Sequence, residues 1–249
     1  MPDAMTLTVI LAVFVLAGAV KGVIGLGLPT VSLGLLTAAI DLPSAIALLI
    51  IPSFLTNVWQ AVAGGRLRAL LPRIWLFLLM AALAIPIGAL ALTRVDYSYL
   101  SAVLGALLMI YALIGLLGFR MTIKPSREGL VGTLLGVING LLTGMTGSFV
   151  VPGVMYLQAI GLSRDDLIAA MGALFTVSTL GLCLSLGWNN LLNSELALQS
   201  SLAVVPALAG MALGQKVRQS ISQQTFRTIF FSALFVLGAY IAARALTGL

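Results

Sequence analysis

A single lysine stands inside a long apolar tract near the start of the chain, and the residues around it could bind an anion. The segment 17–34 carries Lys21 together with five glycines and a proline. A charge inside a membrane segment is costly and by default marks function. Backbone freed by glycine and proline must line a cavity or be buried in protein. We expect the ammonium to attract an anion while Gly25 and Gly27 let backbone amides approach it. Alternatively, Lys21 extends to the cytoplasmic interface.

A second glycine-rich segment follows about half a chain later, at residues 136–152. A shift of about 118 positions places Gly22 on Gly140 and Gly34 on Pro152. Two interrupted hydrophobic segments at matching positions of two halves indicate the binding site of a transporter. Helices that begin after Gly27 and after Gly147 would add their free amides and positive dipole ends. The neutral polar candidates around the second break are Asn139, Thr143, Thr146 and Ser148. Hydrogen bonding between helices is the alternative role for each of them.

Further polar residues occur in the segments that follow these two breaks. Asn57 and Gln60 are three positions apart and so share one face of a helix. Thr176 and Ser178 occupy the corresponding segment of the second half. Both pairs are candidates for the wall of a binding cavity, and interhelical polar contacts are an equally good interpretation.

The composition is that of an integral membrane protein. Of 249 residues, 61% are hydrophobic and only 8% are charged, and the mean hydropathy is +1.16. The apolar tracts are too long for barrel strands, so the spans are helices. The net charge of +6 is scattered over short loops, which is typical of topology signals and does not suggest nucleic-acid binding. We expect one membrane domain covering residues 1–249.

The remaining reactive residues give no sign of an enzyme. The carboxylates lie at or near segment ends or in loops, and the chain has no histidine. Cys183, the single cysteine, lies in an apolar segment and is interpreted as a packing thiol. No metal cluster or general acid–base pair can be proposed from these residues. We therefore expect no catalysis, no metal and no cofactor.

Ten apolar segments predict an all-α polytopic fold of two repeats. The segments are about 5–23, 27–40, 43–62, 74–93, 98–118, 130–146, 149–161, 166–187, 195–214 and 224–246. Residues 120–129 form the linker between a repeat at about 1–119 and another at about 130–249. A shift of 120 positions places Pro86 on Pro206 and Thr56 on Thr176, which supports internal duplication.

The positive charges predict the topology. If ten segments alternate, ten basic loop residues share one side and only Arg94 and Arg244 lie opposite. The ten are Arg66, Arg68, Arg73, Arg120, Lys124, Arg127, Arg164, Lys216, Arg218 and Arg227. Eight crossings would give seven against five, so the positive-inside bias favours ten segments with both Met1 and Leu249 outside. Five segments per half require inverted repeats.

Each glycine-rich pair has too few residues for two full crossings, which need about 40. We therefore expect two re-entrant hairpins, with short or tilted full crossings as the alternative. Three transmembrane helices would complete each repeat. The breaks at residues 25–29 and 143–148 are expected to approach each other in the interior.

The two glycine motifs resemble those of the TauE/SafE family of sulfite and organosulfonate transporters. The matching residues are Gly18, Gly22, Gly25 and Gly27 in the first half, and Gly136, Gly140, Gly147 and Pro152 in the second. Leu28 and Pro29 replace two glycines of the family's pattern, and Thr143 and Thr146 stand at further glycine positions. The resemblance implies passage of small sulfur oxyanions or sulfonates across the bacterial inner membrane, most often as export.

The leading hypothesis is a secondary carrier or uniporter for a small anion that works by alternating access. An anion channel and a non-transporting membrane scaffold are the alternatives. The expected partners are the anion and the lipid bilayer, without nucleic acid, and a homo-oligomer is left open.

Overall fold

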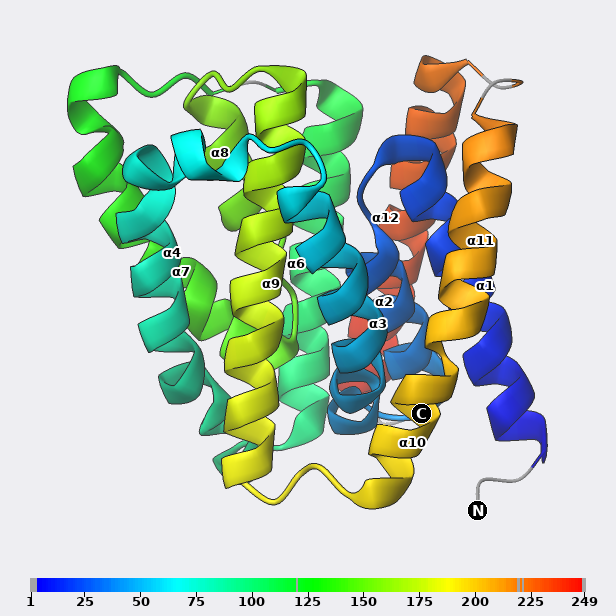
Figure 1. The fold of residues 1–249 in the computed structure, drawn as a ribbon. Coiled ribbons are helices and arrows are strands. Elements are labelled where there is room, and N and C mark those ends of the chain that lie inside the picture. Colours follow the sequence, from blue (N-terminus) through cyan, green and yellow to red (C-terminus); the bar gives the residue numbers. More distant parts are fainter. Residues whose placement is uncertain (1–3, 120, 219, 221, 248–249) are drawn as a thin grey trace. The chain divides into compact units, whose positions relative to one another are not determined.

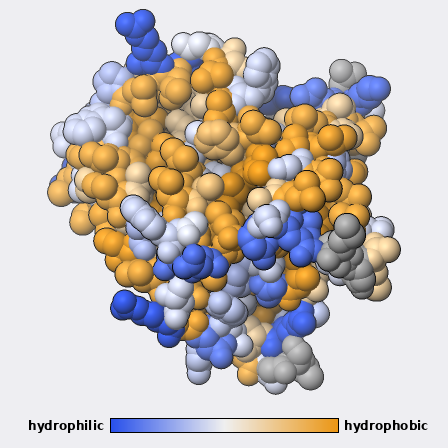
Figure 2. Space-filling view, turned by 60° about the horizontal axis from the view of Figure 1, so that its bottom comes forward, coloured by the Kyte–Doolittle hydropathy of each residue, from blue (hydrophilic) through white to orange (hydrophobic). Residues whose placement is uncertain are grey.

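The computed structural model describes residues 4–119, 121–218, 220 and 222–247, and these residues are almost entirely helical. Within them, eight helical stretches are long and apolar enough to cross a membrane. Hydrophobic side chains cover most of the surface visible in Figure 2, and hydrophilic ones gather in patches. Such a surface suits contact with lipid, and the chain is a multi-pass membrane protein, as its composition predicts.

The helices follow the predicted segments closely along most of the chain. Their bounds are α1 Ala4–Ile24, α2 Leu28–Ala39, α3 Leu42–Val62, α4 Leu67–Ala89, α5 Ala91–Arg94, α6 Tyr97–Leu117, the 3-10 helix η1 Pro125–Arg127, α7 Glu128–Thr146, α8 Gly153–Ala159, α9 Arg164–Trp188, α10 Ser194–Leu202, α11 Val204–Val217 and α12 Gln223–Thr247.

The chain divides into two compact units, and each takes helices from both predicted halves. Unit 1 comprises residues 1–52, 95–118 and 190–249, and unit 2 comprises residues 53–94 and 119–189. Helix α3 begins in unit 1 and ends in unit 2, with Pro52 as the last residue of the first part. The predicted division into two repeats therefore does not coincide with these units and stays a prediction.

In unit 2, helices α4 and α7 lie side by side in close backbone contact (Figure 1). A Cβ atom added to Gly140 would come within 2.3 Å of the carbonyl oxygen of Ala81, and one on Gly144 within 2.2 Å of that of Ile85. Small residues spaced by four allow this approach between membrane helices. A step of four residues along α7 corresponds to a step of four residues in the same direction along α4, so the two helices run parallel.

Unit 1 repeats this kind of packing between α1 and α11, which also run parallel (Figure 1). A Cβ atom on Gly18 would come within 2.2 Å of the carbonyl oxygen of Ala207, and one on Gly22 within 2.3 Å of that of Met211. Helices α6 and α12 of the same unit form an antiparallel pair, with Gly105 against Gly238 and Gly115 against Phe231. Motif glycines in α1 and α7 thus serve helix packing, whereas those at the breaks do not.

A proline interrupts α3 at the end of its unit 1 part. Pro52 lacks an amide hydrogen and cannot bond the carbonyl of Leu48, four residues earlier. The Ser200 hydroxyl from α10 donates to that carbonyl oxygen at 2.8 Å and accepts from the amide of Ile51 at 3.1 Å. A side chain therefore closes the gap that the proline opens.

Basic residues of unit 2 gather where α4, α7 and α9 begin. Ion pairs join Arg73 in α4 to Glu128 in α7, and Arg66 before α4 to Asp166 in α9, so the three helices start at one end. The described basic residues there are Arg66, Arg68, Arg73, Lys124, Arg127 and Arg164, while Arg120 lies outside the described residues. Ten alternating segments require α4 and α9 to run in the same direction, and they do. If the second glycine-rich pair formed one bent crossing, α4 and α9 would run in opposite directions.

In unit 1, α1 begins and α12 ends at the same end of the unit (Figure 1). Arg244 near the end of α12 donates to the carbonyl oxygen of Ala38 near the end of α2. The predicted terminal residues, Met1 and Leu249, lie outside the described residues, so their placement stays a prediction.

Three predicted boundaries are wrong. Helix α4 begins at Leu67, seven residues before the expected segment 74–93, because its first turns carry exposed arginines that hydropathy excludes from an apolar segment. The segment 195–214 is divided into α10 and α11. The helix expected directly after Gly147 begins only at Gly153.

Candidate functional site

The second break, between α7 and α8, is held by the hydroxyl groups predicted to bind a ligand. Helix α7 ends at Gly147, whose φ of 73° lies in the left-handed region that glycine tolerates. The Thr143 hydroxyl donates to the Ser148 carbonyl oxygen at 2.9 Å, and the Ser148 amide donates to Thr146 Oγ1 at 3.2 Å. The Thr146 hydroxyl itself donates to the carbonyl oxygen of Leu142 at 2.7 Å. These groups first of all stabilise the break.

Asn139 connects α7 to the start of α8. Its Oδ1 accepts a hydrogen bond from the amide of Gly153 at 2.9 Å, so this side chain satisfies an amide at the helix start. The side chain is completely buried. Its Nδ2 has no hydrogen-bond partner in the described part of the chain. The Oδ1 atom of Asn139 thus has a structural role, whereas its Nδ2 atom can donate to a further group.

Helix α9 and the second part of α3 pack together in unit 2. Gln60 Nε2 donates to the carbonyl oxygen of Ile168 at 2.9 Å. This is a polar contact between helices, the predicted alternative to a place in the cavity wall. Asn57 is fully buried, and its backbone carbonyl lies against Gly172 of α9. The Thr176 hydroxyl donates to the carbonyl oxygen of Gly172 at 2.7 Å. Ser178 is fully buried, and within the described residues its hydroxyl has no hydrogen-bond partner.

The first break lies in unit 1 between α1 and α2. Gly25 and Gly27 have φ values of 80° and 110°, conformations that disfavour any side chain. Lys21 is only 4% exposed, which weighs against an ammonium extended to the interface. Helix α2 starts at the buried Leu28, and no side chain caps this start. A cation and a helix N-terminus, both favourable to an anion, therefore occur within one short segment.

The predicted site residues fall into two groups. Lys21, Gly25 and Gly27 belong to unit 1, and the other nine belong to unit 2. Within unit 2, Gly153 lies against both Asn139 and Leu174 of α9, and the centroids of the Phe149 and Phe175 rings are 5.6 Å apart. The second break and the middle of α9 are thus neighbours. The expected approach of the two breaks stays a prediction.

Sequence reasoning missed a polar cluster where the helices of unit 2 begin. The Arg73 guanidinium makes two bonds to the carboxylate of Glu128, at 2.6 and 2.8 Å, and a third to the carbonyl oxygen of Ile160. The Tyr156 hydroxyl donates to the Glu128 carbonyl oxygen at 3.1 Å. These bonds join the end of α8 to the start of α7, so the second pair folds back on itself. The partners are far apart in sequence, and no local pattern indicates them.

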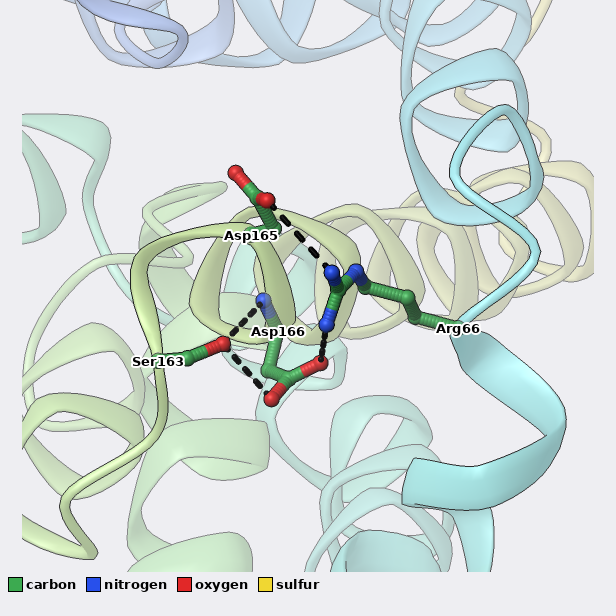
Figure 3. Close-up of polar contacts among 4 residues, drawn as sticks. All are labelled: Arg66, Ser163, Asp165 and Asp166. Carbon is green, nitrogen blue, oxygen red and sulfur yellow. Dashed lines mark hydrogen bonds and ion pairs between the residues drawn. The ribbon is translucent and has the colours of Figure 1, made fainter.

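Arg66 forms a second, more exposed cluster with the start of α9 (Figure 3). Its guanidinium lies 3.1 Å from a carboxylate oxygen of Asp166 and 3.6 Å from one of Asp165. Ser163 Oγ accepts from the Asp166 amide and donates to its carboxylate at 2.7 Å. Because exposed ion pairs contribute little, we assign this cluster to helix capping and loop anchoring.

The comparison with protein families decides the class of this membrane protein. The family model described as sulfite exporter TauE/SafE matches residues 10–241. The chain belongs to the TauE/SafE family. The predicted resemblance is confirmed, and a TauE/SafE protein with eight apolar spans is a membrane transporter. No curated protein and no solved structure matches the chain.

The TauE/SafE motif glycines divide into two structural kinds. Gly18, Gly22, Gly136 and Gly140 face backbone carbonyl oxygens of a neighbouring helix. Gly25, Gly27 and Gly147 have positive φ and form the breaks. The first kind allows close helix packing, and the second forms the turns of the two breaks.

Proposed function

We propose that this TauE/SafE protein is a secondary carrier for a small sulfur oxyanion or organosulfonate in a bacterial inner membrane. It works by alternating access, and the basic helix starts of unit 2 face the cytoplasm. Export is the direction that the family name supports.

The observation that carries this proposal is the burial of Lys21. Among the described residues only two charged side chains are buried, Lys21 and Glu128. Glu128 is bonded to Arg73 at the start of its helix. Lys21 lies close to the glycine break that follows α1, where an ammonium at reduced dielectric attracts an anion strongly.

Each unit has candidate groups of a different kind. In unit 1 these are the Lys21 ammonium and the start of α2, which no side chain caps. In unit 2 they are neutral and buried, and they belong to Asn139, Ser178, Asn57 and Ser148.

The contacts of α1 with α2 and of α7 with α8 support re-entrant hairpins in inverted repeats. Helices α2 and α8 have 12 and 7 residues. At 1.5 Å per residue they are too short to cross a hydrocarbon core of about 30 Å. The 21-residue α1 and 19-residue α7 are long enough to span most of it.

A flux measurement in proteoliposomes tests the carrier function. We expect uptake of labelled sulfite or methanesulfonate that saturates with concentration and is stimulated by unlabelled anion on the opposite side. Conductance without saturation would instead indicate a channel, and absence of flux a scaffold.

A further inference from the structure

The amide of Asn139 can point in only one direction. The backbone amide of Gly153 is a donor, so the atom that it meets at 2.9 Å must be the carbonyl oxygen of the side chain. The contact is tight, since a Cβ atom on Gly153 would come within 2.5 Å of Oδ1. The other end of the amide therefore presents only N–H donors.

A second donor lies one helical turn beyond the same contact. Leu174 of α9 packs against Gly153, and Ser178 follows four residues later on the same helix face. Neighbouring hydroxyls of α9 satisfy themselves within the helix: Thr176 donates to Gly172 O and Thr179 to Phe175 O, at 2.7 and 2.6 Å. Ser178 could bond Leu174 O in the same way, yet its hydroxyl has no partner in the described part of the chain.

Both groups are completely buried, and a buried polar atom without a partner destabilises the free protein. We propose that Asn139 Nδ2 and Ser178 Oγ donate hydrogen bonds to the transported oxyanion, and that the Gly153 amide sets this polarity. The inference rests on the proposed function and adds a rule of selectivity to it. Asn139 offers the ligand donors alone, so this part of the site selects unprotonated oxygen atoms and disfavours ligand groups that carry N–H or O–H.

Ser178→Ala gives the most direct test, with two readouts of opposite sign. The free protein should unfold at the same or a higher temperature, because the change removes a buried hydroxyl that lacks a partner. Binding of sulfite and methanesulfonate to the purified full-length protein should weaken at least about fivefold, the loss of one hydrogen bond to a charged ligand. Ser185→Ala is the matched control: it lies on the same helix and is buried, but its hydroxyl donates to Gly181 O at 2.7 Å.

Asn139→Asp separates the two roles of Asn139. The carboxylate still accepts from Gly153, so the unfolding temperature should stay above that of Asn139→Ala, while binding at pH 8 should be lost. Methanesulfonamide, which carries N–H groups, should bind the parent protein more weakly than methanesulfonate does.

The outcomes separate this inference from the proposed function. If the parent protein binds neither sulfite nor methanesulfonate, the proposed function fails, and this inference fails with it. If the parent binds them and Ser178→Ala binds equally well, only the inference is overturned. A buried water as the sole partner of Ser178 predicts that second result.

Discussion

The hydroxyl group of Ser200 donates a hydrogen bond to the carbonyl oxygen of Leu48 across 2.8 Å. Leu48 would have bonded the amide of residue 52 in a regular helix, but that residue is proline. Ser200 therefore substitutes for a missing main-chain donor, and α10 becomes part of the hydrogen-bonding pattern of α3.

Removing this hydroxyl should destabilise the protein. We expect Ser200→Ala to lower the free energy of unfolding by about 1–3 kcal/mol, because the Leu48 carbonyl loses the donor that replaces the missing amide and the Ile51 amide loses its bond to Ser200. Adding Pro52→Ala should recover part of this loss, since alanine restores the amide. Ser201→Ala is the control: its exposed hydroxyl bonds within its own helix, so no change is expected. Denaturation in detergent compares the parent, Ser200→Ala, Pro52→Ala, the double variant and the control, and additive effects of the two single changes would contradict the interpretation.

Replacing Lys21 should weaken substrate binding. Lys21→Met keeps the apolar stem and should retain the fold while raising the dissociation constant for sulfite at least about tenfold, or about 1.4 kcal/mol. Lys21→Arg should be intermediate, because the larger guanidinium fits a tight site differently. Lys124→Met, which removes an exposed loop charge, should bind as the parent does. Equal binding by Lys21→Met would leave the lysine without a role in recognition.

Filling the glycine contact between α4 and α7 should separate these helices. A Cβ atom at Gly140 would come within 2.3 Å of the Ala81 carbonyl oxygen, which is main chain and cannot rotate away. We expect Gly140→Ala to destabilise unit 2 by about 1–3 kcal/mol, as overpacking does. Gly129→Ala, at the start of the same helix, meets no atom within 4 Å and should be neutral or slightly stabilising. A loss of stability in the second variant alone would contradict the packing shown by α7.

Cysteine labelling tests the orientation in the membrane. Single cysteines at Thr6, Ser126 and Thr247 are introduced after Cys183, the native cysteine, is replaced by serine. An impermeant reagent added to intact cells should label the first and third positions and leave the second unlabelled until the cells are opened. Labelling of Ser126→Cys in intact cells would reverse the predicted topology.

Hydropathy was sufficient to predict most helices, because lipid forces long apolar segments to be helical. The glycine breaks were also predictable: the expected break at 25–29 corresponds to the non-helical residues 25–27. The extent of the second break was not, because α8 starts only where Asn139, fourteen residues earlier, satisfies the Gly153 amide. Likewise Thr143 and Thr146 were predicted as ligand donors, but their bonds hold the break. Such pairings depend on how the helices meet and have no signature in spacing.

The pairing of α1 with α11 also limits the order in which the helices can assemble during synthesis. Gly18 meets the carbonyl of Ala207, which is synthesised 189 residues later. At about 5–20 residues per second, α1 waits about 10–40 seconds for its partner. Unit 2 is complete at residue 189 and can assemble during this interval. The glycine face of α1 that packs on α11 is therefore without this partner in the nascent chain until the last helices arrive.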